Sequence, residues 1–221
     1  MRKLVKWLIH YTYRPWAIWY INSDREYHYK GLRISVPRGV FHPGLFFSSK
    51  MLASQLESND LVGKRALELG CGSAMVSCAM ARLGAEVLAS DINPKAVEAA
   101  INNASQNQLT IQAIESDLFD QLSDQVFDLI VINPPYFAKN PETMTQRAWF
   151  AGENFEYFQK LFMQIGQHMD PQTVVLMSAS EDVELDRIRE IATLKSFEIK
   201  QIAKKRVWME RNYVYQIIKT N

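Results

Sequence analysis

The sequence predicts an α/β fold in which seven strands form a mostly parallel sheet with an antiparallel last strand and helices on both faces. Short apolar segments alternate with amphipathic segments of about 10 to 15 residues, which is the pattern of βαβ units. The segment 127–133 is almost continuously apolar, as expected of a parallel strand covered on both faces. The last two β-prone segments follow each other without room for a helix, so we expect them to pair antiparallel.

The first part of the chain differs in composition from the rest. Three of the five tryptophans lie there, together with several tyrosines. We therefore divide the chain into an aromatic-rich N-terminal extension, residues 1–44, and a main domain, residues 45–221. Helical spacing of apolar residues before Pro15 predicts a short helix, and Lys30-Gly31 between two β-prone arms predicts a hairpin. We expect the extension to pack on the main domain and to form part of the substrate wall.

Residues 36–56 are predicted to run from a Pro/Gly loop into a helix, and regular alternation follows. The predicted strands are 65–69, 86–90, 111–117, 127–133, 173–180, 196–208 and 212–219, and the predicted helices are 73–83, 94–103, 155–169 and 182–194. Gly84 suits the position after a helix, where a left-handed conformation is common. Asn93 and Pro94 are typical of an N-cap and of a first helical turn.

Composition limits the classes of protein to consider. The formal net charge is +1, so no global field attracts nucleic acid or an anionic membrane. Two cysteines, Cys71 and Cys78, are too few for a disulfide framework or a zinc site. No run of about 20 apolar residues occurs, and the basic start lacks a signal-peptide cleavage site. We expect a cytoplasmic protein that uses no metal and no membrane; nothing in the sequence indicates its oligomeric state.

The first motif that bears on chemistry is Gly70-Cys71-Gly72, which follows the buried strand that contains Glu68. Glycines allow the backbone to bend sharply and to approach a ligand closely. Ligands of open α/β sheets bind at the carboxyl ends of such strands. Taken alone, the motif could also be a tight turn, or a dinucleotide site, although the third glycine of such a site is absent near Met75.

Two acids end the next two strands. Asp91 lies about 20 residues after the glycines, where a carboxylate can accept hydrogen bonds from both hydroxyls of a ribose. Asp117 could accept a hydrogen bond from an adenine amino group. Each could instead be a helix cap or a loop acid.

The strongest motif is Asn133-Pro134-Pro135-Tyr136 at the end of the apolar strand. Two prolines cannot continue a central strand, and they stiffen the loop that follows it. The Asn133 side-chain oxygen and the Pro134 carbonyl can each accept a hydrogen bond from an incoming –NH2 group. Tyr136 can stack on a planar substrate. The tetrapeptide therefore indicates an enzyme that holds a planar nitrogen.

In this order, the motifs resemble those of class I S-adenosylmethionine-dependent methyltransferases with a Rossmann-like fold. The resemblance covers about residues 40–220 and is closest to the HemK/PrmC-like group, which methylates glutamine side chains; related families with the same tetrapeptide methylate amino groups of nucleic-acid bases. The resemblance implies a role for each matching residue: cofactor binding by Glu68, Gly70, Cys71, Gly72, Asp91, Ile92, Asp117, Leu118 and Asn133, and catalysis by Asn133, Pro134, Pro135 and Tyr136.

The sequence departs from the HemK/PrmC pattern at three points. Glu68 stands where that group usually has Asp, and Ser48 or Ser49 stands where it has the Thr of a Pro-Arg-x-x-Thr segment. The residues before position 40 do not resemble the helical substrate-recognition domain of glutamine methyltransferases. The resemblance implies S-adenosylmethionine as cofactor and a macromolecular substrate, protein or RNA/DNA. Two alternatives stay open: a dinucleotide-binding oxidoreductase, and a catalytically idle cofactor-binding partner subunit.

Overall fold

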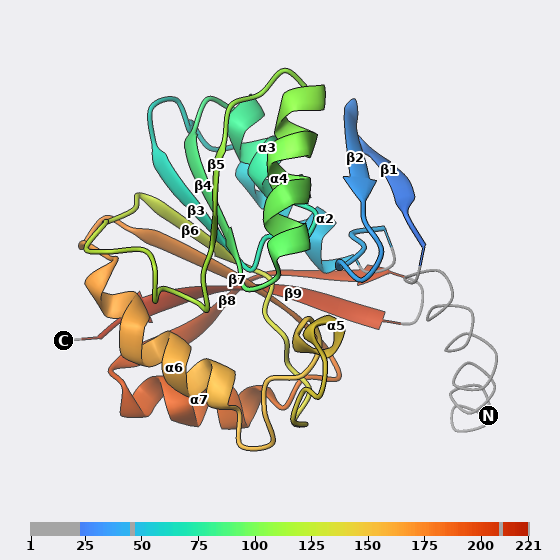
Figure 1. The fold of residues 1–221 in the computed structure, drawn as a ribbon. Helices are drawn as coiled ribbons and strands as arrows, with labels where there is room; N and C mark the ends of the chain where they lie inside the picture. Colours follow the sequence, from blue (N-terminus) through green and yellow to red (C-terminus); the bar gives the residue numbers. More distant parts are fainter. Residues whose placement is uncertain (1–22, 45–46, 208–209, 221) are drawn as a thin grey trace.

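The computed structural model describes residues 23–44, 47–207 and 210–220 (Figure 1). The helix that we predict before Pro15 lies outside these residues. None of the helices within the described ranges is both long and apolar enough to cross a membrane.

A seven-stranded sheet forms the centre of the molecule, in the order β5-β4-β3-β6-β7-β9-β8. The five strands β3 to β7 pair in parallel with one another, whereas β9 pairs antiparallel with both β7 and β8, as the sequence predicts. The strands are β3 Arg65–Leu69, β4 Glu86–Asp91, β5 Gln112–Glu115, β6 Leu129–Ile132, β7 Val174–Ser180, β8 Phe197–Val207 and β9 Glu210–Lys219.

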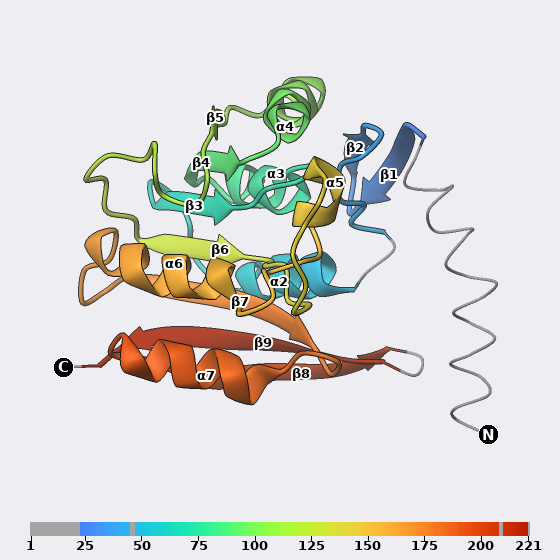
Figure 2. The ribbon, with the colours of Figure 1, turned by 60° about the horizontal axis from the view of Figure 1, so that its bottom comes forward.

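Helices cover both faces of the sheet (Figure 2). α2, α3 and α4 lie on one side, and α6 and α7 lie on the other (Figures 1 and 2). The described helices are α2 Ser48–Leu56, α3 Met75–Arg82, α4 Pro94–Gln106, α5 Met144–Arg147, α6 Glu156–Gln164, the 3-10 helix η1 Ile165–Gln167 and α7 Leu185–Leu194.

The central strands are apolar because alternate side chains enter two different cores. In β6, Ile130 and Ile132 pack in the core that contains α6 and α7. Leu129 and Val131 pack in the core that contains α2, α3 and the N-terminal hairpin. Successive strand residues point to opposite faces, so covering both faces requires an unbroken apolar run.

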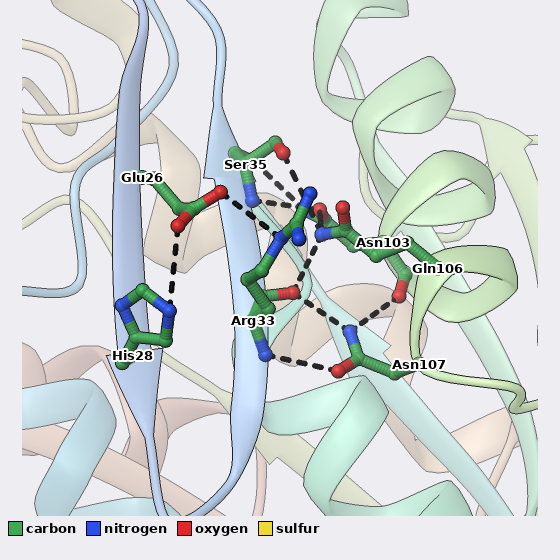
Figure 3. A network of polar contacts seen from close by, with 7 residues as sticks. All are labelled: Glu26, His28, Arg33, Ser35, Asn103, Gln106 and Asn107. Carbon is green, nitrogen blue, oxygen red and sulfur yellow. Dashed lines mark hydrogen bonds and ion pairs between the residues drawn. The ribbon is translucent and has the colours of Figure 1, made fainter.

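The N-terminal hairpin consists of β1 Arg25–Tyr29 and β2 Leu32–Val36, close to the predicted position. Lys30 and Gly31 connect the strands with φ values of 46° and 84°, the positive pair that a two-residue hairpin turn requires. Ile34 is fully buried. The edge of β2 that does not pair with β1 faces α4. Amide side chains at the end of α4 form hydrogen bonds with the backbone of β2 (Figure 3).

Several elements differ from the prediction, among them α4, α5 and the predicted helix 155–169, which divides into α6 and η1. α4 continues to Gln106, three residues past the predicted end at Asn103, because its last turns carry amide side chains that bond to β2. α5 spans only four residues, too few for a periodic signal in the sequence. The Asn93 cap is confirmed, since its side chain accepts a hydrogen bond from the Lys95 amide at 3.1 Å.

Candidate functional site

A pocket of about 500 Å³ opens at the carboxyl ends of β3, β4, β5 and β6. This volume lies within the range of small-molecule sites. β3 and β6 are neighbours whose last residues, Leu69 and Ile132, are in register. The chain leaves the sheet in opposite directions on the two sides of this pair, and such a switch point forms a crevice. The glycine turn after β3 and the Asn-Pro-Pro-Tyr segment after β6 are thereby brought together.

The glycine turn is held tightly by the neighbouring strand. The amides of Gly70 and Cys71 both donate to the Ser90 carbonyl, at 2.8 and 2.9 Å. Gly70 and Gly72 have φ values of +75° and +52°, which favour glycine. A Cβ added to Gly70 would meet no atom within 4 Å, so the turn leaves its surface open toward the pocket.

Asp91 ends β4 and is bonded through both carboxylate oxygens. Oδ2 accepts from the Gly72 amide and Oδ1 accepts from the Asn93 amide, each at 2.8 Å. Burial raises the pKa of Asp91, and these backbone bonds partly offset that effect. A carboxylate has about four acceptor positions, so these bonds leave room for a hydrogen bond from a ribose hydroxyl.

Glu68 lies beneath the turn and caps α3. Its Oε2 accepts from the Ser77 amide at 2.6 Å and from the Ser77 hydroxyl. The residue at the N-cap position of α3 is Ala74, whose methyl side chain cannot accept a hydrogen bond from the helix amides. The Glu68 side chain is 4% exposed, and burial raises its pKa from 4.5 to about 8. Its carboxyl group is therefore largely protonated at neutral pH.

Asp117 lies after β5 and forms an ion pair with Lys160 of α6, at 2.8 Å. Lys160 also pairs with Asp120, at 2.7 Å, and so ties the loop after β5 to α6. Tyr157, on the same helix, lines the pocket. Burial raises the pKa of the Tyr157 hydroxyl, and the nearby charges of Asp91 and Asp117 add to this effect.

Asn133 is held at both ends of its amide. Its Oδ1 accepts from the hydroxyl of Ser178 in β7 at 2.6 Å, and its Nδ2 donates to the hydroxyl of Ser49 in α2 at 3.2 Å. Ser178 is fully buried. Of the two serines that could replace the Thr of the HemK/PrmC pattern, Ser49 contacts the tetrapeptide.

A second recess of only about 10 Å³ adjoins the main pocket and is lined by all four residues of the tetrapeptide. Phe41 and Trp149 also line it, with ring centroids 5.3 Å apart. The Trp149 carbonyl accepts from the Tyr136 amide at 3.2 Å, which fixes the tetrapeptide against the segment that follows α5. Asn133 and Pro135 line both the pocket and the recess, so they lie where the two meet.

All sequence-predicted site residues come together at this one edge of the sheet. The main pocket is lined by Glu68, Gly70, Cys71, Gly72, Asp91, Ile92, Asp117, Leu118, Asn133 and Pro135, and the recess adds Pro134 and Tyr136. Their individual roles stay predictions. Sequence reasoning missed Phe41, Trp149, Tyr157 and Lys160, which come from loops and a helix rather than from strand ends. A single aromatic or basic residue in such a segment is not part of a periodic pattern, so its position in the site could not be predicted from the sequence.

The side chains around the pocket suit S-adenosylmethionine, whose sulfonium and amino groups are both positive. Apart from Glu68, which is largely protonated at neutral pH, the described lining residues include three acids and two bases: Asp91, Asp117 and Glu156, against Arg147 and Lys160. Lys160 is already paired with acids. Such a lining favours a cationic nucleoside over the pyrophosphate of a dinucleotide.

Comparison with known proteins gives consistent matches. The family model described as methyltransferase small domain matches residues 31–178. The ribosomal protein L11 methyltransferase of Thermosipho africanus is 42% identical over 98 residues, which are 44% of this chain and 37% of that protein. The release factor glutamine methyltransferase of Lactococcus lactis is 35% identical over 112 residues, 50% of this chain and 41% of that protein.

A similar fold occurs in the 16S rRNA methyltransferase RsmC of T. thermophilus, solved with AdoMet and guanosine. The TM-score is 0.62 at 20% identity, covering 87% of this chain and 50% of that one. This chain spans about half the length, or less, of the curated relatives that head the comparison.

Proposed function

The chain belongs to the methyltransferase small domain family, and from this membership we propose that it methylates a planar nitrogen of a macromolecular substrate with S-adenosylmethionine. The nitrogen is the amide of a protein glutamine side chain or the exocyclic amine of a nucleic-acid base. The observation that carries this proposal is the position of Asn133, where the pocket meets the aromatic recess.

The glycine turn and Asp91 are the proposed holders of the cofactor. The open side of Gly70 admits the methionine part, and the remaining acceptor capacity of Asp91 binds a ribose hydroxyl. Asp117 and Leu118 flank the adenine. S-adenosylmethionine supplies a methyl group already activated by a positive sulfur, so the protein contributes mainly orientation, worth about 7–11 kcal/mol of the barrier.

Asn133 and the prolines are proposed to orient the acceptor nitrogen. One lone pair of Asn133 Oδ1 accepts from Ser178, which leaves the second for an N–H of the substrate. The Pro134 carbonyl accepts from the other N–H, and the two bonds turn the nitrogen lone pair toward the pocket. The rings of Tyr136, Phe41 and Trp149 line the recess beside the tetrapeptide, and they are the proposed stacking partners of the planar group.

The names of the relatives support a macromolecular substrate. Those relatives are described as acting on a release factor, a ribosomal protein or ribosomal RNA. The acidic pocket lining disfavours the oxidoreductase alternative, and the intact tetrapeptide disfavours the idle subunit. Transfer of tritium from labelled cofactor to fractionated RNA, DNA and protein would identify the class of acceptor.

Asn133→Ala tests the proposal. The change removes the acceptor while leaving β6 and the glycine turn in place, so cofactor affinity should change little. Methyl transfer should slow at least a hundredfold, or about 2.7 kcal/mol of transition-state stabilisation. The measurement is single-turnover transfer to the identified acceptor with saturating cofactor.

Asn59→Ala is the matched control. Asn59 is exposed, lies just after α2 and does not line the pocket. Asn133→Asp keeps one acceptor and loses the donor to Ser49, so partial activity is expected. Near wild-type transfer by Asn133→Ala would mean that the tetrapeptide only ends a strand, and the proposal would fail.

A further inference from the structure

One buried amide connects three separate parts of the molecule. Asn103 is fully buried in α4, where its side chain faces the hairpin strand β2 (Figure 3). Its Nδ2 donates to the carbonyl of Ser35 in β2 at 2.8 Å and to the carbonyl of Ser73 at 2.9 Å. Its Oδ1 accepts from the Ser35 amide at 2.8 Å. The same side chain thus holds the hairpin and the residue that follows the cofactor-binding glycines.

The hydrogen-bonding capacity of Asn103 is fully used. Its Oδ1 also accepts from Gln106 Nε2 at 2.8 Å, so two bonds to the oxygen and two from the nitrogen fill all four positions. A buried network with every position satisfied fixes its members, whereas a missing member leaves an unpaired polar group. Replacing Asn103 would leave the carbonyl of Ser73 unpaired, and Ser73 is only 3% exposed.

The Gly72–Ser73 segment is therefore clamped from two sides. Asp91 accepts from the Gly72 amide, and Asn103 donates to the Ser73 carbonyl one residue later. Asp91 belongs to the proposed cofactor site itself. Asn103 is absent from the pocket lining and acts only through the turn.

We propose that Asn103 is a positioning residue of the cofactor site, and that through it cofactor binding and docking of the β1–β2 hairpin are coupled. The proposal rests on the cofactor site described above. A ligand that rigidifies the turn orders Asn103, and Asn103 in turn holds β2. Such coupling is reciprocal, so a docked hairpin also favours the ligand.

The chain offers a matched control at the same interface. Asn107 bonds to β2 through both backbone groups of Arg33, at 2.9 and 2.7 Å, and its described bonds do not reach the glycine turn. Asn107 also donates to the backbone carbonyl of Asn103 itself, at 2.7 Å. Asn107→Ala therefore removes the attachment at Arg33 and leaves the side-chain link from Ser35 through Asn103 to Ser73 in place, whereas Asn103→Ala removes that link.

The experiment measures affinity for S-adenosylhomocysteine by calorimetry and hydrogen exchange of the Ser35 amide, in the full chain and both variants. Asn107→Ala should keep Kd within twofold. Asn103→Ala should raise Kd at least tenfold. In the unmodified protein, saturating ligand should slow exchange of the Ser35 amide at least threefold relative to that of Ile217 in β9.

Equal Kd values for the two variants would overturn the proposal, whatever their common value. If Asn103→Ala does not fold, the exchange measurement decides alone: a Ser35 amide that the ligand leaves unchanged relative to Ile217 would overturn the coupling. Failure of the unmodified protein to bind the ligand would instead refute the proposed cofactor. Binding with no methyl acceptor found would leave the role of Asn103 intact and count against the proposed reaction.

Discussion

Asp91 shows how one carboxylate organises both the protein and its proposed ligand. It fixes the glycine turn through Gly72 and the start of α4 through Asn93, and it keeps acceptor positions for a ribose. Asp91→Ala removes these acceptors, so we expect S-adenosylmethionine to bind at least tenfold more weakly, a loss of about 1.4 kcal/mol. Calorimetry measures this affinity, with exposed Asp60→Ala as control. Unchanged affinity in a folded variant would refute the assignment.

Glu68 makes the stability of the protein depend on pH. Its pKa in the folded protein is about 8, above the ordinary 4.5, so folding favours the protonated form. Its contribution to the free energy of unfolding is complete below about pH 4.5 and is lost as pH rises to about 8. Glutamine resembles the protonated glutamate side chain but does not titrate. The stability of the Glu68→Gln variant should therefore fall less than that of the unmodified protein across this pH range.

Urea unfolding at several pH values between 4.5 and 9 measures this difference. Glu86→Gln, at the exposed start of β4, is the control. Parallel pH profiles for the unmodified protein and Glu68→Gln would show that Glu68 does not titrate in this range.

Residues at strand ends could be predicted from the sequence, whereas their partners could not. Asp91 and Asn133 follow apolar strands, and parallel strands bring their carboxyl ends to one edge. Lys160 and Asn103 lie on helix faces, and their importance depends on how the helices pack. Asn103 even coincides with the predicted end of α4, because amide side chains often mark helix ends in sequences.

Two elements near the end of β6 fix the proposed catalytic amide. β7 supplies Ser178 and α2 supplies Ser49, so the orientation of Asn133 depends on the packing of three elements. Ser178→Ala removes a buried hydroxyl that donates to Asn133, and the amide gains freedom to rotate. We expect methyl transfer to slow about tenfold, or about 1.4 kcal/mol, with little change in cofactor affinity.

Single-turnover rates measure the effect, and Ser178→Thr should recover part of it because the hydroxyl is retained. Ser54→Ala in α2 is the control, since the Ser54 hydroxyl bonds only locally, to the Met51 carbonyl. If Ser178→Ala transfers the methyl group as fast as the unmodified protein, the hydrogen bond from Ser178 to Asn133 does not contribute to catalysis.

Elements with strong periodicity were predicted well, and short or interrupted ones were not. The apolar strands and the antiparallel end of the sheet follow from burial on two faces and from chain length. The predicted helix 155–169 instead divides into α6 and η1, and α5 has no counterpart in the prediction. Changes of helix type and four-residue helices depend on local tertiary contacts, which sequence spacing does not record.

At the scale of the whole molecule, the predicted fold and family are confirmed. The sheet order places the glycine turn and the tetrapeptide on either side of the β3–β6 junction. Membership of the methyltransferase small domain family agrees with the predicted methyltransferase and with S-adenosylmethionine as its cofactor. The matched region begins at residue 31, inside the hairpin, and therefore includes the residues of β2. The role and boundary of the 1–44 extension stay predictions.

The hairpin completes the core beside α2 and α3, which leads to a prediction for the whole chain. Leu32, Ile34 and Val36 are each at most 3% exposed and share one apolar cluster with those helices. Burial of such a side chain stabilises a protein by about 1.5–3 kcal/mol, and a whole domain is stable by only about 5–15 kcal/mol. Removing residues 1–44 should therefore cost most of the stability.

Two truncated chains isolate the contribution of the hairpin, one that starts at residue 23 and one that starts at residue 45. The difference between them in melting temperature, solubility and methyl transfer reports residues 23–44. We expect the shorter chain to aggregate or to melt at least 10 °C lower, because it exposes the cluster around Ile34. It also lacks Phe41, which lines the recess beside Trp149, and Ser35, which Asn103 holds. Methyl transfer should therefore fall even in whatever fraction stays folded. A chain that starts at residue 45 and stays soluble and fully active would show that the extension is neither part of the core nor part of the substrate wall.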